Sequence, residues 1–340
     1  MRAAAPRVAD LLEWRDWECQ HKVVAIERLA AQGGTSVVVT GPSLVNSAFD
    51  PHLATELLGS RRPAFNAALN AASMRTLALW VGEVLLPKLR PELLVLGLNS
   101  SEFNDNNLVG QRGFDMFRDS LGWRRIRRDG SFWQRVLVGV EKRSFLVRYR
   151  HFLREPGRWG LTMSFADRWR LLRKDFRHRF SRDRGKKAGV TPLGKLFALA
   201  RFEGSPYQVA NPRTLDAWQR IVQSYEVGGH ELAALGGLVD RARATGTDVL
   251  IVRMPVTRDW IDLHPNGNDD YELFERSLEA FVATREVPLL DVLAEFPSLD
   301  EYTDAAHLNE AGRERFTRIV CTAAADLLGT VSERSDGSRP

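Results

Sequence analysis

The stretch VVVTGPSLVNSAFDP, at residues 37–51, joins an apolar β-run to a turn and then to a helical pattern. Its consecutive valines are β-branched and favour a buried strand. Gly41 and Pro42 end that strand, so Ser43 is expected where a strand gives way to a helix. A serine in this place can cap the helix by accepting from its free first-turn amides, or it can act as a nucleophile. The stretch alone leaves both interpretations open.

The chain has 340 residues and is 44% apolar, which is enough to bury a full core in one large domain with insertions or in two small ones. No run of about 18 apolar residues predicts a transmembrane helix. Asp10, Glu13 and Asp16 occupy the place where a signal peptide needs its apolar centre. We therefore predict a cytoplasmic protein. Cys19 and Cys321 belong to no zinc-binding spacing and are interpreted as reduced, structural thiols.

The net charge of +5 is unevenly distributed, because Lys and Arg outnumber Asp and Glu by nearly three to one between residues 111 and 190. Aromatic residues alternate with these arginines, which indicates basic amphipathic helices instead of a disordered tail. Such helices can simply turn a charged face to water. Alternatively, they form a basic lid that attracts an anionic partner such as coenzyme A, an acyl-carrier protein arm, a phosphorylated sugar or an acidic lipid surface. Nucleic acid is not predicted as a partner, because no recognised binding module is present.

Outside this basic block, apolar β-runs alternate with helical patterns, as in βαβ units around a parallel sheet. We predict strands near residues 35–40, 62–68, 93–98, 247–255 and 287–292, and a last helix near residues 309–328. The predicted organisation is an N-terminal helical segment (1–34), a first core part (35–105), a basic helical insertion (106–214), a second core part (215–328) and a loose tail (329–340).

Polar side chains follow the predicted strands. Ser43 follows the first strand, Asn70 the second and Asn99 the third, while the loop after the fifth contains Asp304 and His307 at positions i and i+3. Because the carboxyl ends of parallel strands meet at one edge of an open sheet, we expect these loops to meet there.

These residues match the parts of a serine acyl-transfer site. A hydroxyl needs a base within hydrogen-bond reach and a carboxylate that orients the base, and Ser43, His307 and Asp304 fit those three roles. The negatively charged oxygen of the tetrahedral intermediate also needs fixed hydrogen-bond donors, which together form an oxyanion hole. The candidates are the amide of Ser43, a backbone amide near Ala71 and the side-chain amide of Asn99.

The same residues resemble the SGNH (GDSL) serine esterases and acyltransferases. Gly-Pro-Ser at residues 41–43 stands where that family has Gly-Asp-Ser, Gly-Leu-Asn at 97–99 resembles its Gly-x-Asn block, and the sequence DAAHLNEAG at 304–312 resembles its Asp-x-x-His block. The resemblance implies an α/β, flavodoxin-like three-layer sandwich with about five parallel strands in the order 2-1-3-4-5. The sequences of residues 65–73 and 89–105 look most similar to the branch of this family that contains O-acetyltransferases and D-alanyl-transfer proteins.

The chain departs from the family pattern in ways that bear on the site. Pro42 replaces the acid of the first block, and Asn104 is a rival to Asn99 because the Gly-x-Asn block lies unusually close to its strand. We interpret Asn46, Asn70, Asn104 and His264 as substrate-binding residues. His264 has acidic neighbours, yet its spacing matches no metal site, so neither a metal nor a cofactor is predicted.

The sequence thus predicts a serine esterase or O-acyltransferase that forms an acyl-serine intermediate. The expected substrate is an acylated sugar, a lipid or a thioester-activated acyl group, and hydrolysis and transfer remain open because both use the same residues. The alternative is a catalytically silent fold that binds an anionic partner through its basic insertion.

Overall fold

The computed structural model describes residues 14–59, 63–126, 207 and 212–336. Contacts divide the chain into two compact units, one made of residues 22–114 and 199–340 and the other of residues 1–21 and 115–198. Most of the basic block lies outside the described residues, so the helices predicted beyond residue 126 and the role of the block stay predictions. In the smaller unit, the ring of Phe117 packs against the rings of Trp14 and Trp123, at centroid distances of 5.7 and 5.4 Å.

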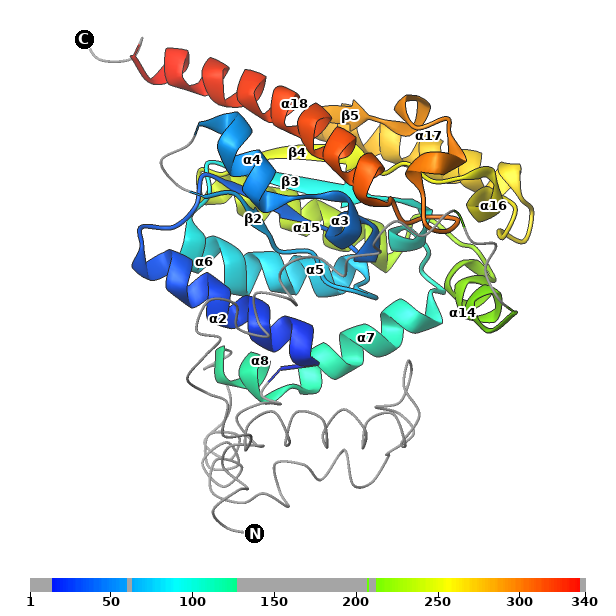
Figure 1. Cartoon of the computed structure of the whole chain (residues 1–340). Helices are drawn as coiled ribbons and strands as arrows, with labels where there is room; N and C mark the ends of the chain where they lie inside the picture. Colours follow the sequence, from blue (N-terminus) through cyan, green and yellow to red (C-terminus); the bar gives the residue numbers. More distant parts are fainter. Residues whose placement is uncertain (1–13, 60–62, 127–206, 208–211, 337–340) are drawn as a thin grey trace, which may run out of the picture. The chain divides into compact units, whose positions relative to one another are not determined.

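The larger unit is built on five parallel strands in the order β2-β1-β3-β4-β5 (Figure 1). They are β1 (Val37–Thr40), β2 (Phe65–Asn66), β3 (Leu93–Leu98), β4 (Asp248–Arg253) and β5 (Leu289–Asp291). Every residue of β1 and β3 is buried, as expected for strands covered by helices on both faces. The predicted fold class and strand order are confirmed.

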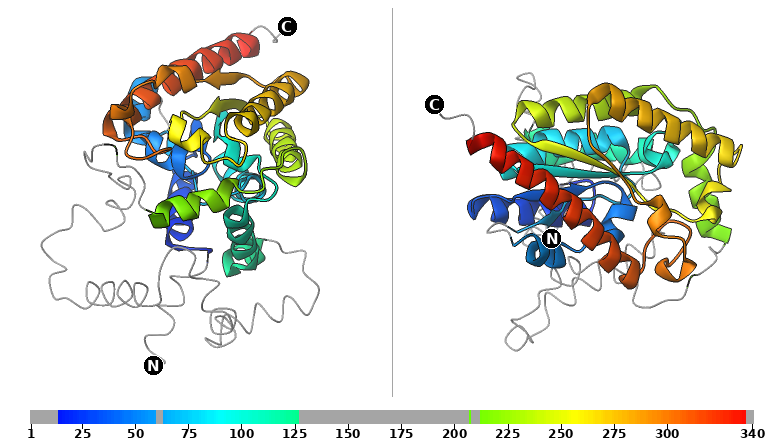
Figure 2. Two further views of the ribbon diagram at one scale, coloured as in Figure 1. Left: turned by 90° about the vertical axis from the view of Figure 1, so that its right-hand side faces the viewer. Right: turned by 90° about the horizontal axis from the view of Figure 1, so that it is seen from above.

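Helices cover both faces of this sheet (Figures 1 and 2). One face carries α3 (Ser43–Ala48), α4 (Pro51–Leu58) and the long α18 (Glu310–Asp336). The other carries α5 (Met74–Trp80), the π-helical turn η1 (Val81–Leu85), α6 (Leu86–Leu89), α15 (His230–Ala244) and α17 (Asn268–Arg285). The remaining helices are α2 (Trp17–Ala31), α7 (Leu108–Asp119), α8 (Leu121–Ile126), α14 (Pro212–Val222) and α16 (Arg258–Ile261), with 3-10 turns η2 (Ser100–Glu102), η3 (Leu293–Glu295) and η4 (Leu299–Glu301).

Two further details concern the helices. Pro87 lies in the first turn of α6, and the chain stays helical to Leu89. Proline is tolerated there because the first turn of a helix needs no amide donor. Within the part of the chain that the structure describes, no helix has both the length and the apolar composition to cross a membrane.

Candidate active site

The turn after β1 explains why a glycine precedes the serine. Gly41 has φ +154°, and a side chain there would overlap the carbonyl oxygen of Gly97 and the side chain of Val45. Only glycine therefore lets the end of β1 pass this close to the end of β3. The chain then turns directly into α3, with Ser43 as its first residue.

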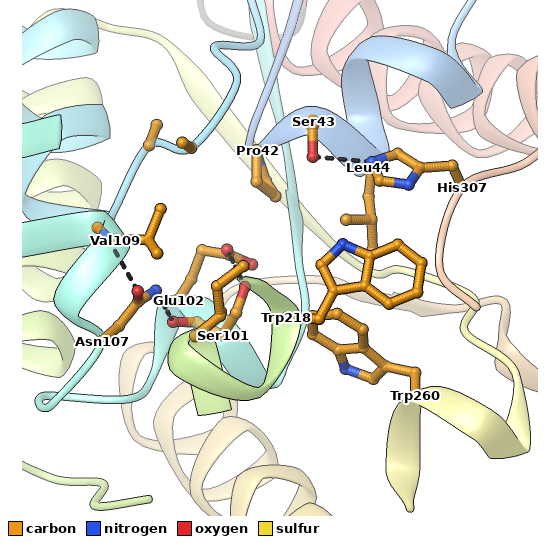
Figure 3. Close-up of a pocket in the computed structure, with 14 residues that line it drawn as sticks. Pro42, Ser43, Leu44, Ser101, Glu102, Asn107, Val109, Trp218, Trp260 and His307 are labelled. Atoms are coloured by element: carbon orange, nitrogen blue, oxygen red, sulfur yellow. Dashed lines mark hydrogen bonds between the residues drawn. The ribbon is translucent and has the colours of Figure 1, made fainter. Parts of the chain in front are cut away.

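Ser43 does not cap this helix. The cap position is Pro42, which makes no side-chain cap bond, and the Oγ atom of Ser43 lies 2.9 Å from Nε2 of His307 (Figure 3). The side chain is partly exposed, so a substrate can reach the hydroxyl. Of the two interpretations that the sequence left open, this geometry favours the nucleophile.

The loop between η4 and α18 holds the second half of this arrangement. Nδ1 of His307 lies 2.9 and 3.0 Å from the two carboxylate oxygens of Asp304, and Oδ1 of Asp304 also accepts from the amides of Ala306 and His307. Burial alone would raise the pKa of Asp304, but the hydrogen bonds and the charge of His307 outweigh it and lower that pKa. A charged Asp304 favours the tautomer with the proton on Nδ1, which leaves Nε2 free to accept from Ser43.

The loop is fixed to the rest of the fold by its backbone. The amide of Thr303 donates to the carbonyl of His307 at 2.9 Å, and Thr257, which follows β4, donates to the carbonyl of Ala305 through both its amide and its hydroxyl. Asp304 and His307 are thereby held at the carboxyl end of the sheet, beside the residue that follows β1.

Two predicted backbone donors lie at the same edge. The amide of Ser43 is in the first turn of α3 and so has no acceptor within the helix. Ala71 has φ +50°, a left-handed conformation that non-glycine residues rarely adopt. The amide of Ala72 donates to Leu69, whereas that of Ala71 makes no hydrogen bond with the described residues. This difference favours Ala71 over Ala72 as the donor.

The structure also separates the two candidate asparagines. Oδ1 of Asn99 accepts from the amide of Ser101 at 2.6 Å, while its Nδ2 is buried without a partner among the described residues. Both ends of the Asn104 amide are used, since Nδ2 donates to the carbonyl of Ile221 at 2.8 Å and Oδ1 accepts from the amide of Glu226. Asn104 holds the loop that follows α14, and its contact with substrate stays a prediction.

A pocket of about 410 Å³, which includes its solvent-filled mouth, opens beside Ser43 and His307 (Figure 3). The apolar wall includes Leu44, Val109 and the indole rings of Trp218 and Trp260, which contact each other edge to face at 6.2 Å. The polar wall consists of Ser101, Glu102 and Asn107. A small, largely apolar group with one polar end therefore fits this pocket.

His264 was predicted to bind substrate, and the structure places it in the core. The residue is 3% exposed, and its Nε2 contacts the hydroxyl of Ser100 at 2.9 Å. Its ring packs edge to face against Tyr225 and Tyr271, and burial lowers its pKa. His264 is a core residue because these aromatic rings cover it, and it does not line the pocket.

Asn46 and Asn70 lie together, with Nδ2 of Asn46 3.3 Å from Oδ1 of Asn70. The buried Lys22 donates to Oδ1 of Asn46 and to the carbonyl of Ala68. Neither asparagine lines the pocket, although Asn70 is exposed next to Ala71, so their contact with substrate stays a prediction.

Several pocket residues were not predicted from the sequence, among them Trp218, Trp260 and Glu102. Trp218 and Trp260 come from helices that precede and follow β4, and no local pattern marks them as neighbours. Glu102 did carry a signal, since an asparagine followed three residues later by a glutamate is typical of a reciprocal helix cap. The structure contains that capping box between Asn99 and Glu102.

No protein-family model and no curated protein matches the chain. Several solved structures are similar. A GDSL-like lipase from Bacteroides thetaiotaomicron has 9% identity over 92% of this chain and 99% of its own, with a TM-score of 0.42. An aryl esterase from M. smegmatis has 11% identity over 87% and 99%, and a carbohydrate acetylesterase from Sinorhizobium meliloti has 10% over 86% and 99%, both with a TM-score of 0.40. Such low values assign neither an activity nor a substrate to this chain.

Proposed function

We propose that the chain is an SGNH-type serine esterase or O-acyltransferase that works through an acyl-Ser43 intermediate. The observation that carries this proposal is the continuous hydrogen-bonded series from Ser43 Oγ through His307 to Asp304. Ser43 follows β1, whereas Asp304 and His307 share the loop between η4 and α18, and the three meet at the carboxyl end of the sheet. A serine that only caps a helix has no need of a histidine held by a carboxylate.

In the proposed reaction, Ser43 Oγ attacks the acyl carbon while Nε2 of His307 takes its proton. Asp304 keeps the imidazole in the required tautomer and stabilises its positive charge. The amides of Ser43 and Ala71 and Nδ2 of Asn99 donate to the oxygen that becomes negative. His307 then gives its proton to the leaving group, which departs and leaves the acyl group on Ser43.

The acyl-enzyme can be resolved by water or by an acceptor hydroxyl, with His307 again removing the proton. The pocket wall of Leu44, Val109, Trp218 and Trp260 supports a short apolar acyl group, supplied as an acylated sugar, a lipid or a thioester of coenzyme A or an acyl-carrier protein. The basic insertion, predicted to attract such an anionic donor, and the cytoplasmic location are part of this proposal.

A catalytically silent fold is the competing interpretation. It would be favoured by side chains of Ser43 and His307 that point apart, whereas their 2.9 Å contact supports the enzyme.

The proposal is tested with a fluorophosphonate probe, which labels activated serines. We expect the wild type to be labelled and Ser43→Ala to remain unlabelled. Ser47→Ala is the matched control, because Ser47 lies in the same helix but its hydroxyl bonds, among the residues that the structure describes, only to the carbonyl of Leu44. Labelling that persists in Ser43→Ala would overturn the assignment. Short- and long-chain p-nitrophenyl esters, and acyl-CoA with sugar acceptors, then separate hydrolysis from transfer.

A further inference from the structure

The carboxyl group of Glu102 lies in the polar wall of the pocket and is hydrogen-bonded to the backbone of the candidate oxyanion-hole residue Asn99. Oε2 of Glu102 accepts from the backbone amide of Asn99 at 3.0 Å, and Oε1 is in hydrogen-bond contact with the hydroxyl of Ser101. The amide of Ser101 in turn fixes Oδ1 of Asn99. Together these bonds orient Asn99 so that its Nδ2 remains without a partner.

Glu102 is buried without a compensating positive charge. Its exposed fraction is 2%, and no ion pair within the described part of the chain includes it. The groups that face it electrostatically are Glu231 of α15 and Tyr225, and neither supplies a cation, since Glu231 is itself paired with Arg75. An ionised carboxylate in such a place is costly.

The protonation of Glu102 follows from the same surroundings. Burial raises the pKa of Glu102 to about 8, and the hydrogen bonds from Ser101 and Asn99, which lower it, are weaker effects. At neutral pH the acid form therefore predominates, with one oxygen accepting from the amide of Asn99 and the other in hydrogen-bond contact with the hydroxyl of Ser101.

We propose that Glu102 is a positioning residue that holds Asn99 for the oxyanion, and that it does so as a neutral carboxylic acid. The inference rests on the proposed acyl-transfer function. Ionisation of Glu102 would place a negative charge beside the oxygen that becomes negative in the transition state, and the two like charges would repel each other. The enzyme is thus expected to lose turnover at alkaline pH through a pocket-wall group that acts on the oxyanion by way of Asn99.

The test uses Glu102→Gln, because a glutamine copies the neutral acid in shape and in hydrogen bonding. Its carbonyl can accept from Asn99, and its amide can donate to Ser101. The wild type should lose kcat about tenfold between pH 7 and pH 9, since about one tenth of Glu102 stays protonated one unit above its pKa of about 8. Glu102→Gln should change less than about twofold over that range, as expected for a group that no longer titrates.

The measurement is kcat for a p-nitrophenyl ester from pH 6 to 10, with spontaneous hydrolysis subtracted. Glu226→Gln is the matched control, because the Glu226 carboxylate is exposed and bonds only to Asn106 among the described residues. This variant should keep the alkaline loss of the wild type. If Glu102 had only a structural role, Glu102→Gln would change the stability of the protein but would not remove the alkaline loss of kcat.

Ser101→Ala provides a second, independent measurement should Glu102→Gln fold poorly. Removing the hydroxyl removes a bond that lowers the pKa of Glu102, so the alkaline loss should move to higher pH. An active wild type whose alkaline loss persists in Glu102→Gln, or does not move in Ser101→Ala, would overturn the inference. A wild type without any esterase activity or probe labelling would instead overturn the proposed function.

Discussion

Replacing Asp304 with asparagine separates orientation of the histidine from the fold of its loop. In Asp304→Asn, the side-chain oxygen can still accept from the amides of Ala306 and His307, at the distances of 3.0 and 2.8 Å seen for Oδ1. The new amide group, however, faces Nδ1 of His307 and donates to it. The proton of the imidazole then moves to Nε2, which can no longer accept from Ser43.

The expected loss is large in turnover and small in stability. The wrong tautomer costs about 10⁴-fold in kcat in serine enzymes, which corresponds to about 5 kcal/mol of transition-state stabilisation. Because both backbone bonds are retained, the free energy of unfolding should fall by no more than about 1 kcal/mol. Asp304→Ala, which removes both acceptors, should instead cost about 2 kcal/mol of stability.

The two effects are measured by ester hydrolysis and by urea unfolding of the same preparations. Asp300→Asn is the control, because the exposed Asp300 is an acid that directly precedes the same loop. If Asp304→Asn keeps turnover within tenfold of the wild type while Asp300→Asn loses it, the assignment of Asp304 is refuted.

The pH dependence of stability gives a further check on Asp304. Its pKa is lowered in the folded state from the ordinary 3.8, so its contribution is present above 3.8 and is lost as the pH falls through the folded-state value. The stability difference between wild type and Asp304→Asn should therefore shrink below pH 3.8. A constant difference across this range would show that the carboxylate is not stabilised by its neighbours.

Three other substitutions test separate parts of the account. Asn99→Ala should lower kcat by about 10²- to 10³-fold with little change in KM, because one donor to the oxyanion is lost. The exposed control Asn106→Ala should keep the wild-type kcat. If both variants have the same kcat, Asn99 is not an oxyanion donor. Ala71→Gly should raise the free energy of unfolding by about 0.5 kcal/mol in urea titrations, because glycine tolerates φ +50°. A lower free energy of unfolding would show that the backbone of Ala71 is not strained. Changing the four arginines of residues 123–130 to glutamine should raise the KM for acyl-CoA and reduce the salt dependence of that KM. Hydrolysis of a small neutral ester should be unchanged. Equal losses of activity on both substrates would indicate that these arginines have a structural role.

The core of the fold could be predicted because its determinants are local. The run of valines before Gly41 and the apolar run before Asn99 are buried strands in the structure as in the prediction. Strand order is not a local property, and the prediction depended on the resemblance of three short blocks to a known family. The approach of Ser43 and His307, 264 positions apart, followed from that order, because both come from the carboxyl ends of strands.

Side-chain partners that are distant in sequence could not be predicted. The sequence does not distinguish Asn99 from Asn104 as an oxyanion donor. In the structure, the side-chain amide of Asn104 is already hydrogen-bonded to backbone groups of residues 221–226. His264 has acidic neighbours in the chain, but its burial depends on rings from other segments. The tryptophans of the pocket likewise meet only through tertiary packing.

The central claim is that Ser43 carries the acyl group during turnover, and it is tested most directly by trapping that intermediate. The wild type is mixed with excess p-nitrophenyl ester, quenched in acid during the steady state and digested for peptide mass spectrometry. The account predicts the mass of one acyl group on Ser43, with no such addition in Ser43→Ala and a reduced rate of acylation in Asp304→Asn. Turnover of the ester with an unmodified Ser43, or an acyl group on another residue that persists in Ser43→Ala, would contradict the account.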